Sequence, residues 1–185
     1  AGPTGRQPRA AEVAQPALEV TVRDTQRSRV YAAEEFVRTL FDRVAQHSSR
    51  AIDFFGAQLT LPPEARFGSI QSVQRYVDDV LALPAVADRW TPTGALQVRP
   101  RRAAAAAHYE KRSGTGVIAV PDRNTADWAM RELVLLHEIA HHLDDTGGAA
   151  HGSGFVATLC ELAALVMGPE VGHVLRVVYT KEGVR

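Results

Sequence analysis

Apolar residues recur along the chain at two spacings, and each spacing predicts a different type of element. Steps of three and four residues mark one face of a helix, and they predict helices over residues 24–46, 70–83, 126–143, 155–167 and 170–179. Short runs rich in β-branched and aromatic residues predict strands over residues 51–61, 95–102, 104–112 and 117–121. This order predicts an α+β fold, in which a small mixed β-sheet packs against helices.

Capping and turn residues mark the ends of these elements. Asp24 and Ser69 are suited to cap the first two helices, because a short polar side chain can accept a backbone N–H there. Pro84 follows the end of the second helix, and the two prolines at 62–63 end the first strand. Ser153 is the expected cap of the helix that begins near residue 155.

Length and composition predict one globular domain preceded by a tail. A chain of 185 residues, 45% hydrophobic and 23% charged, can bury a core as a single domain, which we assign to residues 20–185. Residues 1–19 contain three prolines, two glycines and little apolar content. We therefore expect this segment to be a flexible tail.

Charge, cysteine content and hydropathy limit the functions open to the chain. The formal net charge is zero, which argues against a dominant non-specific interaction with nucleic acid or an anionic membrane. The single cysteine, Cys160, cannot form a disulfide within the chain and is expected in the core. No apolar run approaches the roughly 18–20 residues that span a bilayer, and the first residues hold no apolar segment typical of a signal peptide. We therefore expect a cytoplasmic protein.

The densest chemistry lies in HEIAHHLDDTGGAAHGSGF, residues 137–155, which holds four of the chain's seven histidines. His137 and His141 are four residues apart on a predicted helix, so both imidazoles face the same side. Glu138 can reach a water on a metal held by these histidines without ligating the metal itself. This H-E-x-x-H pattern is typical of zinc hydrolases, in which zinc lowers the pKa of its water toward roughly 7 and the glutamate takes the proton.

A catalytic zinc site also needs a third protein ligand and an open fourth position. We favour His151, because the glycine-containing loop after His141 can turn back over the helix and a new helix starts directly after the ligand. Glu161 on that following helix is an alternative ligand, although a role in orienting a ligand histidine through its other ring nitrogen fits it better. Asp144 or Asp145 is closest in sequence, but the short side chain of Asp144 favours a supporting role.

A peptidase of this kind needs a donor for the oxyanion that forms on the substrate. His108 and Tyr109 lie on a predicted strand, whose alternation lets at most one of them point into the cleft. Tyr31 and Tyr179 are weaker candidates. His142 points about 100° away from its neighbouring ligand and is expected at the surface or beside the ligands.

The motif HExxH, a linker and HGxxF together resemble the SprT-like and wider gluzincin-type metallopeptidases. The strand VIAVP and the lead-in RELVLLHEIAHHL are similar to the strand and active-site helix of these enzymes. The longer stretch from VRDTQRSRVYAAE through LTLP, SVQRYVDDVL, AAHYEKR and GVIAVP to the C-terminus resembles an actinobacterial family of HExxH metallohydrolases. The resemblance implies a zincin-like, gluzincin-type fold, with His137, His141 and His151 as zinc ligands and Glu138 as the base. The linker before the third histidine is shorter than in the SprT-like pattern.

These features predict a zinc-dependent hydrolase, and we favour a metallopeptidase that cleaves peptide bonds in a peptide or protein substrate. The edge of strand 104–112 or 117–121 could hold such a substrate as an added strand. A zinc hydrolase of a non-peptide amide would use the same ligands and base, so the sequence leaves it open. A non-catalytic metal-binding or partner-binding module is the other alternative, and Glu138 argues against it because such a module needs no base.

Overall fold

The computed structural model describes residues 23–47, 49–91, 94–102, 106–121 and 130–185, and the structural statements below concern these residues. The tail expected over residues 1–19 lies outside the described residues. So do residues 126–129, the expected first turn of the helix that carries the histidine motif.

Helices occupy both ends of the described chain and the stretch between its strands. They are α1 (Arg27–Gln46), α2 (Ile70–Ala82), α3 (Pro84–Arg89), α4 (Glu132–Leu143), α5 (Ser153–Val166) and α6 (Pro169–Lys181). The apolar stripe that predicted α1 is buried, and its residues are Val30, Ala33, Val37, Phe41 and Val44. Among the described helices, none combines the length and the apolar character needed to cross a bilayer.

The prediction for the start of α2 is confirmed. The Ser69 side chain accepts the backbone N–H of Ser72 at 3.1 Å, and the Ser72 hydroxyl reaches back to the Ser69 backbone, so the two serines form a capping box. Pro84 does follow α2, but it also begins the short helix α3, which the sequence reasoning missed. Proline suits the first position of a helix because its missing N–H would have no partner there.

Two other predicted caps are wrong. Gln26, not Asp24, is the N-cap residue of α1, without a side-chain cap bond. Asp24 accepts the Gln26 backbone N–H with Oδ1 at 3.2 Å, while its Oδ2 reaches the histidine site, as described below. Gly152 is the N-cap residue of α5, and Ser153 is its first helical residue.

The main sheet contains three strands in the order β3-β5-β4. β3 (Leu96–Arg101) pairs parallel to β5 (Thr115–Pro121), and β4 (His108–Arg112) pairs antiparallel to β5, so the sheet is mixed as predicted. The central strand β5 is buried from Gly116 to Pro121, in keeping with the continuous apolar run that predicted it. β4 pairs with one strand only within the described residues, so its other side is an edge.

The single strand expected over residues 51–61 is instead a hairpin of β1 (Ala51–Phe54) and β2 (Ala57–Thr60). Phe55 and Gly56 connect the two strands with positive φ angles of 52° and 82°. Positive φ at both central residues is the requirement of a two-residue type I′ turn, and Gly56 meets it without strain. The bulky Phe55 at the other turn position hid this turn from a reading of the sequence.

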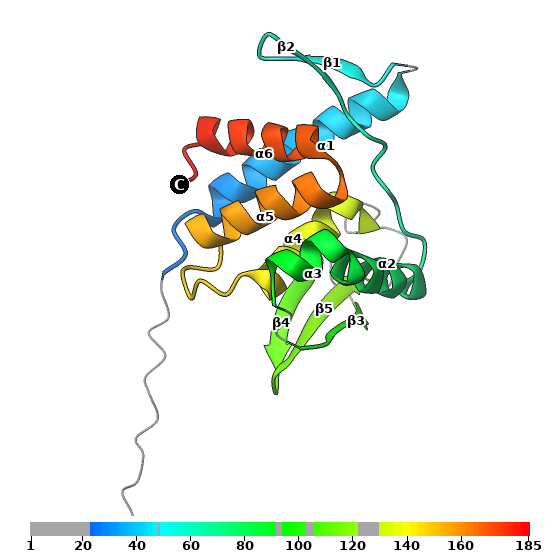
Figure 1. Ribbon diagram of the computed structural model, residues 1–185, viewed down its shortest axis with the longest axis vertical. Coiled ribbons are helices and arrows are strands. Elements are labelled where there is room, and N and C mark those ends of the chain that lie inside the picture. The colour runs from blue at the N-terminus through cyan, green and yellow to red at the C-terminus, as the bar shows by residue number, and fades with distance from the viewer. Residues whose placement is uncertain (1–22, 48, 92–93, 103–105, 122–129) are drawn as a thin grey trace, which may run out of the picture.

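Helix α4 lies between a helical layer and the sheet. In Figure 1, α1, α5 and α6 lie together on one side, while the sheet β3-β5-β4 extends from the opposite side. α4 contacts α5 on the helical side and β4 and β5 on the other, while α2 packs on β3. Every residue of α4 except His141 is buried, so the motif helix is the centre of the core. The structure is therefore α+β, with small sheets packed against helices.

Candidate metal centre

Three histidines converge on one point at the buried centre of the fold. His137 Nε2 lies 3.2 Å from a ring nitrogen of His141 and 3.4 Å from one of His151, both Nε2. The ligand atoms of all three residues lie within 4.8 Å of one another. Imidazoles that hold zinc tetrahedrally at about 2.0–2.1 Å place their nitrogens roughly 3.3 Å apart. The three histidines are therefore close enough to bind one metal ion, and two of the spacings suit tetrahedral coordination.

A buried carboxylate of α1 orients His137. Glu34 accepts a hydrogen bond from His137 Nδ1, which lies 2.8 and 3.0 Å from its two carboxylate oxygens. The Tyr179 hydroxyl of α6 donates to the same carboxylate at 2.8 Å. Because Nδ1 carries the donated proton, Nε2 is left with a free lone pair that points into the histidine cluster.

A second carboxylate orients His151 in the same way. Asp24 Oδ2 lies 2.6 Å from His151 Nδ1, and the Gln26 side chain donates to the His151 backbone carbonyl at 3.2 Å. The segment just before α1 thus fixes both the ring and the backbone of the third histidine. Such carboxylate–histidine pairs are usual behind metal ligands.

Aromatic rings enclose the cluster on two sides. The Phe155 ring lies 4.8, 4.3 and 5.1 Å, centroid to centroid, from His137, His141 and His151. Tyr31 of α1 stacks on His137 at 5.5 Å and lies 5.4 Å from His151. These rings limit the rotamers open to the imidazoles and keep water from most of their surface, which strengthens electrostatic interactions at the site.

Burial and neighbouring charges set the protonation of the histidines. Burial, together with His137 and His151, lowers the pKa of His141 to about 2. Burial also lowers the pKa of His151, against the effect of Asp24. For His137 burial favours the neutral form, but Glu34 and Glu138 together outweigh it and the pKa is raised. Since a metal binds neutral imidazole, His137 is the ligand position at which protons compete most strongly.

Glu138 lies beside the cluster and has the properties of a general base. Its side chain is buried, with the residue 5% exposed. Burial raises the pKa of Glu138, while His137 and a backbone hydrogen bond from Tyr109 act in the opposite direction. A carboxyl group with a raised pKa can both accept and release a proton nearer neutral pH than an exposed glutamate can.

A cleft of about 390 Å³ opens beside the histidines and Glu138. Both His108 and Tyr109 line this cleft, whereas the alternation of the strand led us to expect one at most. The Tyr109 ring lies nearly parallel to that of His141, with centroids 6.2 Å apart. His108 is exposed. Tyr31 also lines the cleft, but Tyr179 is buried behind Glu34 and does not.

His142 is not at the surface, which was one of the two places expected for it. It is buried against β5, its Nδ1 lies 3.2 Å from the Tyr109 hydroxyl, and its Nε2 lies 3.3 Å from the Gly94 carbonyl. A Cβ atom on Gly116 would lie 2.5 Å from the same Nδ1. Glycine at that position of β5 therefore makes room for the imidazole, which in turn contacts the tyrosine of the cleft.

Glu161 does not orient a ligand histidine, contrary to our expectation. It forms an ion pair with Arg89 at 2.7 Å, with both side chains partly exposed, and the orienting roles belong to the two carboxylates described above. Asp144 lines the cleft, where its carboxylate accepts hydrogen bonds from the backbone and hydroxyl of Thr146. Cys160 is buried in the core as predicted.

The first turn of α4 is held to the segment after β2 by one carboxylate from each side. Glu64 accepts the backbone N–H of Leu133 at 3.3 Å and also pairs with the Arg131 guanidinium, both of these charged side chains being buried. Glu132 in turn accepts the Ala65 N–H at 2.9 Å. Carboxylates suit the positive end of a helix. These bonds fix where α4 begins and so position its histidines.

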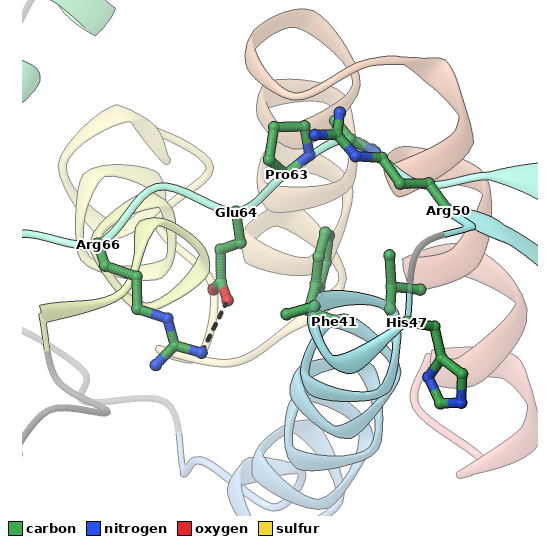
Figure 2. A pocket seen from close by; sticks show the side chains of 9 residues that line it. Phe41, His47, Arg50, Pro63, Glu64 and Arg66 are labelled. Carbon is green, nitrogen blue, oxygen red and sulfur yellow. Dashed lines mark ion pairs between the residues drawn. The ribbon is translucent and has the colours of Figure 1, made fainter.

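The same segment borders a second hollow, of about 270 Å³, shown in Figure 2. Glu64 and Arg66 border it side by side, with Oε2 and Nη2 4.0 Å apart, and Arg66 also donates to Asp42 of α1 at 2.8 Å. Phe41 of α1 contributes its apolar wall. Glu64 and Arg66 are engaged in ion pairs within the fold. We therefore assign this hollow no separate role.

Glu34 and Asp24 are the site residues that the sequence reasoning missed. Glu34 lies on the predicted apolar face of α1, among Val30, Ala33 and Val37. A carboxylate on a buried helix face requires a partner, and this signal could have identified it.

No protein-family model matches the chain, and comparisons with curated proteins and with solved structures gave no match either. Inference about function therefore depends on the chemistry of the site itself.

Proposed function

We propose that this protein is a zinc-dependent metallohydrolase of the zincin type that cleaves peptide bonds. The observation that carries the proposal is the convergence of three imidazoles within 4.8 Å at a cleft that also contains Glu138. His137, His141 and His151 are the proposed ligands, because three histidines with one open position form a common catalytic zinc site. The two carboxylates behind the ligands support a site built for a metal.

The remaining chemistry is assigned to side chains of the cleft. Zinc bound at the histidines would polarise the substrate carbonyl and lower the pKa of a water to about 7. Glu138 takes the proton from that water and passes it to the leaving amine. Glu34 and Asp24 keep Nδ1 of their histidines protonated, so that Nε2 stays the donor atom.

The substrate is proposed to lie along β4. The outer side of this strand pairs with no other strand in the described part of the chain, and its first residues, His108 and Tyr109, line the cleft. An extended peptide could add to this edge through backbone hydrogen bonds. The two side chains are then the candidate donors to the oxyanion.

Metal content and peptide cleavage, measured together, test the proposal. We expect elemental analysis to find about one zinc per chain and a fluorogenic peptide library to contain cleaved sequences. His151→Ala should lose the metal. Glu138→Gln should keep the metal and lose cleavage by about 10²–10⁴-fold, the usual contribution of a general base. Glu161→Gln is the matched control, because its carboxylate pairs with Arg89 at the surface, and it should keep both properties.

Each failure has a distinct meaning. A protein that takes up no transition metal, even after zinc is added, contradicts the proposal as a whole. Full activity in Glu138→Gln contradicts the assigned base. A zinc protein that cleaves simple acyl amides but no peptide would instead support the alternative of a non-peptide amidase.

A further inference from the structure

Arg27, the first residue of α1, borders the cleft with an exposed side chain. Its guanidinium carbon lies 5.5 Å from the centroid of the Tyr31 ring. Within the described residues, no ion pair joins Arg27 to an acidic side chain. A positive charge therefore faces the cleft without a carboxylate to neutralise it.

Glu138, which borders the same spaces, makes no ion pair with Arg27 within the described residues. Two other acidic side chains of this region are committed to other partners. Asp24 accepts from His151 Nδ1 at 2.6 Å. Glu34 binds His137 Nδ1 and the Tyr179 hydroxyl. An anion that neutralised Arg27 would thus have to come from outside these groups.

Arg27 lies within reach of the metal centre. Its guanidinium carbon is 5.5 Å from the centroid of Tyr31, which is 5.5 Å from that of His137. The guanidinium is therefore no more than two such steps from the His137 ring. These two distances together correspond to the length of about three residues of extended chain, at roughly 3.3–3.6 Å per residue.

A smaller hollow of about 120 Å³ adjoins the cleft at this point. Arg27, Tyr31 and Glu138 border both spaces, so these residues lie between them. Ala106, Ala107 and Val134 make part of the hollow apolar. Arg38 also borders it, but this arginine already pairs with Glu34 and Glu35. The hollow offers room for a small side chain next to the Arg27 guanidinium.

We propose that Arg27 binds a carboxylate of the substrate. The protein would then hydrolyse an amide bond that lies within about three residues of a free carboxylate, with a neighbouring small side chain in the 120 Å³ hollow. Arginine suits this role because its planar guanidinium can bind both oxygens of a carboxylate. The carboxylate can be the C-terminus of a peptide or an acidic side chain. This inference rests on the proposed hydrolase function and specifies its substrate class.

Binding of thiol compounds to the cobalt-substituted protein tests the inference without turnover. One series is mercaptoacetyl-glycine, -diglycine and -triglycine, each beside its primary amide, so that the members of a pair differ only in the terminal carboxylate. A separate pair is the α-amides of mercaptoacetyl-aspartic acid and mercaptoacetyl-asparagine, which differ in the side-chain carboxylate. Affinity is read from the thiolate-to-cobalt charge-transfer band. We expect the carboxylate member of at least one pair to bind about ten- to a hundredfold more tightly, the range of a hydrogen bond between charged groups.

Variants of Arg27 test whether this residue causes the preference for the carboxylate compound. Arg27→Gln should bind both members of a pair equally, and Arg27→Lys should keep part of the preference. Arg43→Gln is the matched control, since Arg43 is an exposed arginine in the last turn of the same helix and should keep all of it. The pair that shows the preference tells whether the carboxylate is terminal or in a side chain.

The possible failures can be told apart. Equal affinity within every pair for the wild-type protein, or a preference that survives in Arg27→Gln, overturns the inference but leaves the metal centre in place. A protein that shows no histidine-ligated cobalt spectrum at all overturns both the inference and the proposed function.

Discussion

The substitution Glu34→Gln tests whether the buried carboxylate of α1 strengthens metal binding through His137. Glutamine has nearly the same size, and its amide oxygen can take the place of Oε1. That oxygen is the acceptor both from His137 Nδ1 and from the Tyr179 hydroxyl, each at 2.8 Å. The substitution therefore removes a negative charge while both hydrogen bonds can remain.

The expected loss follows from this geometry. Removing a partner behind a metal ligand costs about 10–100-fold in metal affinity. We expect the lower end, about tenfold or 1.4 kcal/mol, because the hydrogen bond to His137 can persist and only the charge that makes its imidazole more basic is lost. The effect should not be screened by solvent, since the Glu34 side chain is only 2% exposed.

The loss should also depend on pH. Burial lowers the pKa of His137, but Glu34 and, to a smaller extent, Glu138 raise it, so the pKa lies above its ordinary value in the wild-type protein. As pH falls through that raised pKa, protons displace the metal from the wild type first. In Glu34→Gln protons compete less with the metal for His137 at the same pH. The difference in zinc affinity between wild type and variant should therefore be largest at neutral pH and should narrow on acidification.

Zinc affinity is measured by competition with a chromogenic chelator, beside the thermal unfolding of the metal-free proteins. Glu35→Gln is the matched control, because Glu35 is the next residue of α1, its side chain is 72% exposed, and it pairs with Arg38 rather than with a histidine. Zinc affinity of Glu34→Gln equal to that of the wild type at neutral pH would refute the reasoning. An equal loss in the Glu35 variant would refute it as well.

Three further substitutions have expected outcomes. Asp24→Asn should weaken zinc binding less than the Glu34 variant in the same chelator assay, because the Asp24 side chain is 22% exposed and solvent can replace part of its effect. Burial raises the pKa of Asp42, but Arg131 outweighs it and the pKa is lowered. The resulting stability is present above the unfolded pKa and is lost as pH falls through the folded one. Urea unfolding at neutral and acidic pH should therefore show the wild type losing more stability than Asp42→Asn, by less than about 1 kcal/mol because Asp42 is 44% exposed; equal losses would contradict this. Gly116→Ala would bring a methyl group to 2.5 Å from a buried imidazole nitrogen, so we expect a loss of about 1–3 kcal/mol in unfolding free energy, and an unchanged melting temperature would count against it.

The sequence alone determined those features that depend on residues close together in the chain. The apolar period identified the region of each long helix, and Ser69 marked the start of α2, because a capping bond joins groups only three residues apart. The spacing of His137 and His141 placed both imidazoles on one face of α4. His151 was identified from the short loop that returns to the same helix, and its ring does reach the other two.

The prediction failed where a short stretch of sequence is compatible with more than one local conformation. The run at residues 51–61 has the composition of a strand throughout, and only the positive φ angles at Phe55 and Gly56 divide it into a hairpin. Asp24 has the side chain of a helix cap, and its Oδ1 accepts the Gln26 backbone N–H, but Gln26 is the N-cap residue and Asp24 Oδ2 binds the His151 ring. The hydrogen bond to the imidazole is thus added to the local backbone bond, and no local pattern reveals it.

The completed site was decided by the tertiary structure. Glu34 and Asp24 are separated from their histidines by 103 and 127 positions in the chain, so no local pattern could pair them. The packing of α1 against the centre of the fold brings these carboxylates behind the imidazoles, and the same packing brings Arg27 to the edge of the cleft. The local sequence supplies the donor atoms of the site, whereas long-range packing supplies the charges that orient them.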